Sequence, residues 1–144
     1  MRVEDLDRVM GIERLIYPFP WSRGNFDDSL AAGYDAWIFA AGPRILGYAV
    51  LMWSLDEVHL LNLSVDANEQ GRGLGRRILE VLCADIRQRG GRAVLLEVRP
   101  TNEVALRLYR AASFETIGLR RGYYPDSGGK REDAIVMRRV LEHG

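Results

Sequence analysis

The chain has 144 residues, 47% of them hydrophobic, which is enough for one domain with a substantial core and leaves little room for a second. Its 20 basic and 20 acidic residues give a formal net charge of zero. This balance excludes a global electrostatic attraction to nucleic acid or to an acidic membrane surface. We therefore expect a single domain over residues 1–144 that binds neither nucleic acid nor a membrane.

The few cysteine and histidine residues point away from disulfide and metal chemistry. A single cysteine, Cys83, excludes an internal disulfide and a cysteine-cluster metal site, and its helical apolar surroundings favour a core role over a nucleophilic one. Neither His59 nor His143 has a partner at metal-ligand spacing, so we expect no metal site. No run approaches the ~18 apolar residues of a spanning helix, and no signal peptide is recognisable. We expect a cytoplasmic protein.

The N-terminal part of the chain predicts two helices. Apolar residues recur at three- and four-residue spacings from Val3 to Tyr17, which is typical of an amphipathic helix. The prolines of Pro18-Phe19-Pro20 end this helix. Ser22 is then placed to cap a second helix that extends to about Ala32.

Three strands and a third helix follow. Residues 36–41 and 45–53 are rich in β-forming side chains and flank the turn Gly42-Pro43, which predicts an antiparallel hairpin. A third strand is predicted from Glu57 to Val65, followed by a glycine-containing segment. The third helix ends at Gly90-Gly91, and one apolar stripe is expected along it, made by Leu74, Ile78, Val81, Leu82 and Ile86.

The C-terminal part alternates strands with one short helix. The strand from Ala93 to Val98 is nearly all apolar, as expected of an interior strand reached by a βαβ crossover, and Glu97 interrupts it. Asn102 is a good N-cap for a helix with Ala105, Leu108, Tyr109 and Ala112 on one face. Two more strands are predicted at about 115–124 and 133–141. The expected fold class is therefore mixed α/β, with a mostly antiparallel sheet and a central parallel strand pair.

Strand, glycine segment and helix, in that order, predict an anion site between Glu57 and Gln88. Glycines allow close approach of the backbone, and a helix N-terminus carries partial positive charge. Gly75-Arg76-Arg77 lacks the lysine and hydroxyl of a Walker loop, and the spacing differs from that of a dinucleotide fingerprint. On the evidence of the loop alone, an ordinary glycine turn and an anion site are equally good interpretations.

The segment Gln70-Gly71-Arg72-Gly73-Leu74-Gly75 resembles the Q/R-x-x-G-x-G/A element of the GNAT superfamily of N-acetyltransferases, and the expected element order is similar to theirs. Further segments resemble the RimI type, the bacterial ribosomal-protein alanine N-acetyltransferases, in the same order and over nearly the whole chain. They are Phe19-Pro20-Trp21-Ser22, Asn62 to Asp66, Glu97-Val98-Arg99, Asn102, Ala105-Leu106-Arg107-Leu108-Tyr109, Arg121-Gly122-Tyr123-Tyr124-Pro125 and Arg131-Glu132-Asp133-Ala134. One difference is Ser113-Phe114, where the family usually has Gly-Phe.

The resemblance implies acetyl-coenzyme A as cosubstrate. Its pyrophosphate would bind the loop residues Gly71, Arg72, Gly73, Leu74, Gly75 and Arg76. The backbone around Leu63, Ser64 and Val65 would hold the pantetheine arm and polarise the thioester oxygen, if this strand is not fully paired. Asn102 would contact the cofactor arm, a role that is compatible with helix capping.

The resemblance also implies catalytic and acceptor-binding residues. Glu97 would be the general base, although an acid on a strand more often faces solvent, and Tyr109 the general acid, although a tyrosine on an apolar helix face is usually core. An acceptor groove for a peptide N-terminus would be lined by Phe19, Trp21, Tyr123 and Tyr124, all of which could instead be plain core.

The implied function is transfer of acetyl to a protein N-terminal amine in a ternary complex. The subfamily acceptor is an N-terminal alanine of a small-subunit ribosomal protein. Two alternatives stay open, namely an acetyltransferase for lysine side chains or small amines, and a non-catalytic acyl-coenzyme A-binding module. Presence of both Glu97 and Tyr109 argues against the second alternative. The sequence does not indicate an oligomeric state.

Overall fold

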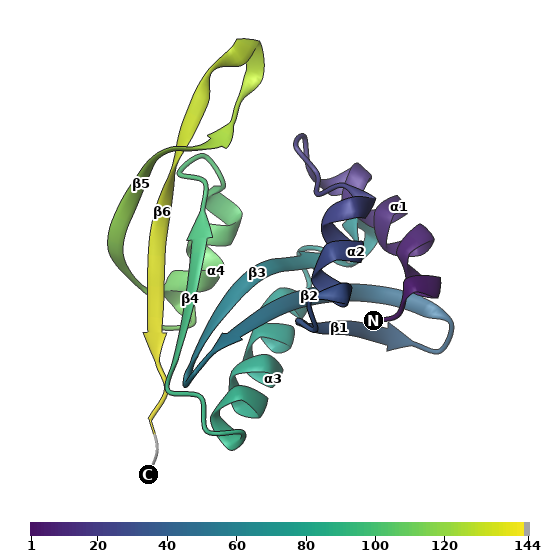
Figure 1. The fold of residues 1–144 in the computed structure, drawn as a ribbon, viewed down its shortest axis with the longest axis horizontal. Helices are drawn as coiled ribbons and strands as arrows, with labels where there is room; N and C mark the ends of the chain where they lie inside the picture. The colour runs from purple at the N-terminus through teal and green to yellow at the C-terminus, as the bar shows by residue number, and fades with distance from the viewer. Residues whose placement is uncertain (143–144) are drawn as a thin grey trace. The chain divides into compact units, whose positions relative to one another are not determined.

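The computed structural model describes residues 1–142, and its chain path is drawn in Figure 1. The predicted element order is confirmed. The helices are α1 (Leu6–Ile16), α2 (Arg23–Ala31), α3 (Leu74–Gln88) and α4 (Glu103–Ala111). The strands are β1 (Asp35–Ala41), β2 (Arg44–Ser54), β3 (Glu57–Val65), β4 (Ala93–Val98), β5 (Glu115–Pro125) and β6 (Arg131–Val140). Short 3-10 helices are η1 (Val3–Asp5), η2 (Ala67–Glu69) and η3 (Ser127–Gly129).

The described strands form one sheet in the order β1-β2-β3-β4-β6-β5. The predicted hairpin of β1 and β2 is antiparallel, as are the pairs β4–β6 and β5–β6. β3 and β4 run parallel, with Glu57–His59 opposite Ala93–Leu95. This confirms the predicted mixed α/β class with a parallel pair on either side of the glycine segment.

Contacts divide the chain into two compact units. Unit 1 comprises Met1–Trp53 and Leu60–Ile78, and unit 2 comprises Ser54–His59 and the chain from Leu79 onward.

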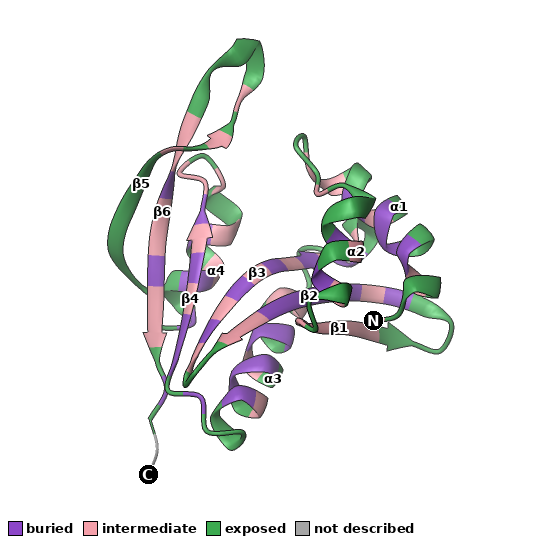
Figure 2. Cartoon of the chain, viewed as in Figure 1, coloured by how far each residue is buried: buried purple, intermediate pink, exposed green. Residues whose placement is uncertain are grey.

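The core of unit 1 lies between α1, α2 and β2. Ser22 caps α2, as predicted, by accepting a hydrogen bond from the Asn25 amide. The buried apolar side chains of this core are Leu6, Val9, Met10, Phe26, Ile45, Tyr48 and Val50, and Figure 2 shows the buried stretches of these three elements in purple. The apolar stripe of α1 is thus confirmed at its centre. Val3, which the stripe also included, lies in η1 and is exposed.

Unit 2 contains β4, β5, β6 and α4, together with most of α3. The predicted stripe of α3 is wrong at Val81, which is 50% exposed, because the buried face turns toward Leu79 and Cys83 instead. Cys83 is buried and free, which confirms its core role, and burial raises the pKa of its thiol to about 11. On α4 the buried residues are Leu106 and Tyr109.

At the C-terminal end of α4, Ser113 stands where the family usually has glycine. Ser113 has φ 69°, in the left-handed region where glycine is the common residue. Its amide donates to the Arg110 carbonyl at 3.1 Å, and the Phe114 amide donates to the Tyr109 carbonyl at 2.9 Å. The helix therefore ends in a left-handed cap with serine in place of glycine.

Gly47 in β2 allows a close approach of the β3 backbone. A Cβ added there would lie 2.6 Å from the Ser64 carbonyl oxygen and 3.0 Å from Ile78 Cδ1. Backbone cannot yield as a flexible side chain does, so any larger residue would push β2 away from β3.

We expect Gly47→Ala to lower the free energy of unfolding by about 1–3 kcal/mol, the usual cost of overpacking. Urea denaturation of the full chain measures it. Gly118→Ala is the matched control, because a Cβ in that strand position would have no neighbour closer than Val136 Cβ at 4.0 Å. Equal losses in the two variants would contradict the close-approach explanation.

Candidate active site

The predicted site residues are distributed over both units. Unit 1 contains Phe19, Trp21, residues 63–65 and the loop residues 71–76, whereas unit 2 contains Glu97, Asn102, Tyr109, Tyr123 and Tyr124.

The glycine loop leads from η2 into α3. Gly71 (φ 80°) and Gly73 (φ 74°) both have left-handed backbone conformations, which residues with a Cβ rarely adopt. The Arg77 amide donates to the Gly73 carbonyl at 3.2 Å, so the first turn of α3 starts at the second of these glycines. A helix start with this shape directs backbone N–H groups and the positive end of the helix dipole outward, which suits a phosphate group.

Side chains hold this loop against the end of β3. Gln70 Nε2 donates to the Val65 carbonyl at 3.0 Å. Glu69 is buried, and its carboxylate forms ion pairs with Arg44 and, at 3.7 Å, with Arg72. Sequence reasoning missed Glu69, although an acid placed directly before an arginine-rich loop is a candidate for holding that loop.

The β3 segment next to the loop carries Leu63, Ser64 and Val65. Ser64 is buried, and its hydroxyl donates to Asn62 Oδ1 at 2.6 Å. The Leu63 carbonyl accepts a hydrogen bond from the Tyr17 hydroxyl at 3.1 Å. A role of this backbone in polarising a thioester stays a prediction.

A buried carboxylate, Glu13 of α1, is surrounded by hydrogen-bond donors. It is 1% exposed. Tyr48 donates its hydroxyl to Glu13 Oε1 at 2.6 Å, and Asn62 Nδ2 donates to the same oxygen at 3.4 Å. The Trp21 amide donates to Glu13 Oε2 at 2.9 Å. Burial, together with the hydrogen bond to Glu13, raises the pKa of Tyr48 far above its ordinary value, so its hydroxyl stays a donor.

Glu13 was not recognised from the sequence. Its position gave a signal, because it follows Leu6, Val9 and Met10 at helical spacing and therefore lies on the apolar face of α1. An acid on such a face must either find donors or leave the core, since an unpaired buried charge is costly.

Glu97, the predicted general base, lies on β4 with its side chain 8% exposed. Its Oε2 is paired with His59 Nε2 of β3, and its Oε1 lies 3.3 Å from Arg120 Nε of β5. The carboxylate is therefore desolvated, as predicted for a base, and held in place from both sides.

The partners of Glu97 follow from the sheet register. His59 is opposite Leu95 in the parallel ladder, and Glu97 comes two residues after Leu95 on the same face. Arg120 is opposite Ala134, while Glu97 is opposite Val136, two residues further along β6. Sequence reasoning missed both partners because it did not fix these registers.

Tyr109, the predicted general acid, is buried on α4 with its ring centroid 5.6 Å from that of Phe114. Tyr109 therefore has core packing, the alternative to a catalytic role that the sequence left open. Asn102 caps α4 as predicted, with Oδ1 accepting from the Ala105 amide at 3.2 Å. The catalytic role of Tyr109 and the cofactor contact of Asn102 stay predictions.

The two aromatic residues of unit 1 differ in exposure. Phe19 is 40% exposed. Trp21 is partly buried, and its ring centroid lies 5.0 Å from that of the core residue Phe26. Phe19 is thus available to a ligand to a greater extent than Trp21.

The two aromatic residues of unit 2 lie on β5. Tyr123 is exposed, and its ring centroid lies 4.9 Å from that of Tyr124. Arg99 stacks over Tyr124 with its guanidinium carbon 4.4 Å from the ring centroid. Burial, and secondarily the charge of Glu97, raises the pKa of Tyr124 well above its ordinary value. Its hydroxyl is therefore protonated at physiological pH.

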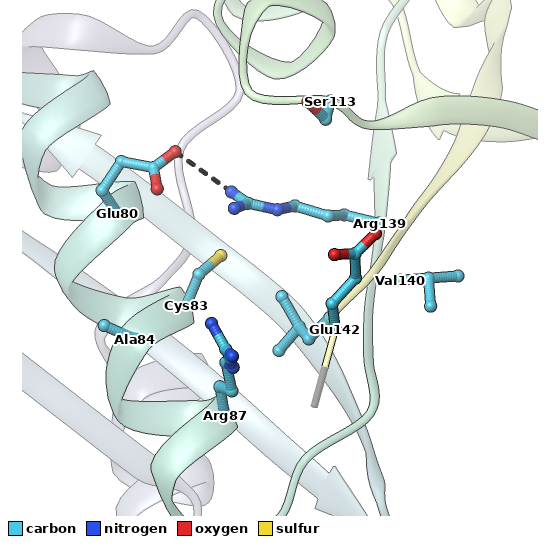
Figure 3. Close-up of a pocket in the computed structure, with 9 residues that line it drawn as sticks. Glu80, Cys83, Ala84, Arg87, Ser113, Arg139, Val140 and Glu142 are labelled. Carbon is cyan, nitrogen blue, oxygen red and sulfur yellow. Dashed lines mark hydrogen bonds and ion pairs between the residues drawn. The ribbon is translucent and has the colours of Figure 1, made fainter. Parts of the chain in front are cut away.

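Unit 2 also has a cleft that contains none of the predicted site residues. Its volume is about 350 Å³, and Figure 3 shows the side chains that line it. Arg139 crosses the cleft to Glu80, with Nη1 and Oε1 3.1 Å apart. The cleft is lined by Glu80, Cys83, Ala84, Arg87, Ser113, Arg139, Val140, Leu141 and Glu142.

Within residues 1–142, no three His, Cys, Asp or Glu side chains come together as a metal-binding group, and no helix is both long and apolar enough to cross a membrane. His143, the second histidine considered from the sequence, lies outside the described residues.

Comparison with known proteins gives concordant results. The model of the acetyltransferase (GNAT) family matches residues 6–114. The chain is 36% identical over 137 residues to the [ribosomal protein bS18]-alanine N-acetyltransferase of Escherichia coli strain K12, covering 95% of this chain and 92% of that protein. The crystal structure of the ribosomal-protein-S18-alanine N-acetyltransferase from Escherichia coli superposes with a TM-score of 0.90 at 34% identity, covering 100% of this chain and 92% of that one. The structure of yncA from Salmonella typhimurium with its cofactor acetyl-CoA has the same fold, with a TM-score of 0.77 at 18% identity over 100% of this chain and 92% of that one.

Proposed function

The chain belongs to the acetyltransferase (GNAT) family, and from this premise we propose that it transfers the acetyl group of acetyl-coenzyme A to the N-terminal amine of a protein. The acceptor in this proposal is an N-terminal alanine of a small-subunit ribosomal protein. The observation that carries it is 36% identity over 95% of the chain to a protein named for that reaction.

The proposed cofactor site uses the glycine loop. The loop amides of Gly71–Arg76 would hold the pyrophosphate, supported by the left-handed conformations of Gly71 and Gly73. Leu63, Ser64 and Val65 would hold the pantetheine arm, and Asn102 would contact it as well. We propose residues 1–144 as one N-acetyltransferase domain, active in the cytoplasm, with the family match over 6–114 in support.

In the proposed mechanism the amine attacks the thioester directly, in a ternary complex. Glu97 takes the proton of the substrate ammonium, through water, and the neutral nitrogen forms a bond to the carbonyl carbon. The carbon–sulfur bond then breaks, and the thiolate takes a proton from the Tyr109 hydroxyl. The second proton, which the nitrogen loses as it becomes an amide, restores the Tyr109 hydroxyl through water. This transfer, from a phenol with a reference pKa of ~10 to a thiolate whose acid has a pKa of ~8.5, is uphill by about 1.5 pKa units and is completed when the phenolate regains a proton. Burial keeps the Glu97 carboxylate largely out of solvent, and its contacts with His59 and Arg120 hold it in one orientation, which supports its role as base.

The acceptor peptide would contact aromatic side chains. Phe19 and Tyr123 are the exposed members of the predicted set, and Trp21 and Tyr124 would support them from partly buried positions. An aromatic surface suits a peptide with a small apolar first residue, such as alanine.

An acceptor panel tests this proposal. The full chain is incubated with acetyl-coenzyme A and equal concentrations of an N-terminal alanine peptide, the same peptide with a blocked N-terminus and an internal lysine, and a polyamine. We expect kcat/KM for the alanine peptide to exceed the others by at least about 10²-fold, because only it presents the proposed acceptor amine. Preferred turnover of lysine or polyamine would overturn the acceptor assignment. Calorimetric cofactor binding without acetylation of any acceptor would instead indicate a non-catalytic acyl-coenzyme A-binding module.

A further inference from the structure

The loop between α1 and α2, residues 17–21, is fastened at both of its ends within unit 1. At its start, the Tyr17 hydroxyl donates to the Leu63 carbonyl at 3.1 Å and lies 2.9 Å from Ser64 Oγ. At its end, the Trp21 amide donates to the buried carboxylate of Glu13 at 2.9 Å. We call residues 17–21 the acceptor loop, because the proposed function gives Phe19 and Trp21 to the acceptor peptide.

In this network, the donor and the acceptor of each hydrogen bond can be assigned. Ser64 Oγ donates to Asn62 Oδ1 at 2.6 Å, and Asn62 Nδ2 donates to Glu13 Oε1 at 3.4 Å. Since the Ser64 hydrogen is committed to Asn62, the single Tyr17 hydroxyl hydrogen is shared between Ser64 Oγ and the Leu63 carbonyl in a bifurcated bond. Burial raises the pKa of Tyr17 to about 12, so this hydroxyl keeps its proton at neutral pH.

The Tyr17 side chain joins the acceptor loop directly to the β3 segment Leu63–Ser64 through both of these contacts. The residues between the two fastened ends are Pro18, Phe19 and Pro20. Proline fixes its own φ and restricts the residue before it, so few backbone torsions remain free in the loop. The backbone path that carries Phe19 is therefore restricted by the two end contacts.

We propose that Tyr17 is a positioning residue for acetyl transfer, which fixes the acceptor loop on the strand segment Leu63–Ser64 so that the acceptor peptide is presented to the thioester. This inference rests on the proposed function, which assigns the acceptor to the loop and the thioester to the strand. Misplacement of a substrate by even a small distance is costly in rate, because catalysis depends on a near-attack geometry.

The test is Tyr17→Phe in the full chain, which removes only the hydroxyl. We expect kcat/KM for the N-terminal alanine peptide to fall about tenfold, the effect of one lost hydrogen bond that holds the site, mainly through a lower kcat. The Kd for acetyl-coenzyme A should stay close to that of the wild type, and the melting temperature should fall only by the few degrees that one lost hydrogen bond costs. Tyr34→Phe is the matched control, because Tyr34 also packs against the core of unit 1 and lies outside this network.

The outcomes separate the inference from the proposed function. A wild type that acetylates the peptide, together with a Tyr17→Phe variant of equal kcat/KM, overturns the inference alone. Parallel losses of acetyl-coenzyme A affinity and melting temperature in Tyr17→Phe also overturn it, because they indicate a general structural role. A wild type that neither acetylates nor binds the peptide in calorimetry overturns the proposed function and, with it, the inference.

Discussion

Glu97→Gln is expected to lower kcat for the N-terminal alanine peptide by about 10²-fold or more at neutral pH, the range of general-base catalysis. Glutamine has nearly the same shape but cannot take the proton of the substrate ammonium. The loss should shrink as the pH rises above the α-amine's reference pKa of about 8, because the amine is then already neutral. Steady-state kinetics across pH, with peptide and acetyl-coenzyme A varied separately, measure both effects.

Two controls distinguish loss of the general base from other effects of the substitution. Glu115→Gln changes an exposed glutamate on β5 and should leave kcat within about twofold, as surface substitutions usually do. Calorimetric titration of Glu97→Gln with acetyl-coenzyme A should give a Kd near that of the wild type. A Glu97→Gln variant with a wild-type pH profile would refute the general-base role, even if His59 and Arg120 hold its side chain as they hold the carboxylate.

Glu13→Ala should destabilise unit 1 strongly. It removes the acceptor of three donors, namely the Tyr48 hydroxyl, the Asn62 amide and the Trp21 backbone N–H. Each buried donor left without a partner costs about 1–3 kcal/mol, so we expect a total loss of about 4 kcal/mol in the free energy of unfolding. Urea denaturation of the full chain measures the loss.

A double-mutant cycle with Tyr48→Phe tests the cause. Removal of the Tyr48 hydroxyl should lower the free energy of unfolding less in the Glu13→Ala variant than in the wild type. In that variant the hydroxyl has already lost its acceptor. Glu4→Ala, at an exposed glutamate of η1, should change stability by less than about 0.5 kcal/mol. Strict additivity of Glu13→Ala and Tyr48→Phe would show that the loss arises elsewhere.

Local signals in the chain were sufficient for the elements and for the loop. The two prolines after Tyr17, the cap residues Ser22 and Asn102, and the β-rich run of residues 57–65 act over a few neighbours, so the sequence displays them directly. The glycine loop could also be predicted from the sequence, because the left-handed conformations at Gly71 and Gly73 favour glycine at each position.

The sequence predicted less well which residues of each helix are buried. On α3 the apolar residues cover more than one face, so the spacing that included Val81 and the spacing that includes Leu79 and Cys83 both fit the pattern. The structure buries the face that includes Leu79 and Cys83. Glu13 shows the same limit for a polar residue, since its donors come from the loop, β2 and β3 rather than from α1.

The sequence by itself determined the order of elements, the strand–loop–helix around Gly71 and Gly73, and the family to which these features belong. Only the tertiary structure decided the partners of the reactive and buried side chains. His59, Glu97 and Arg120 are 38 and 23 residues apart along the chain, and strand register alone makes them neighbours. Register depends on the summed packing of whole strands, whereas a glycine's conformation depends on one residue, and for this reason the loop was predictable and the neighbours of Glu97 were not.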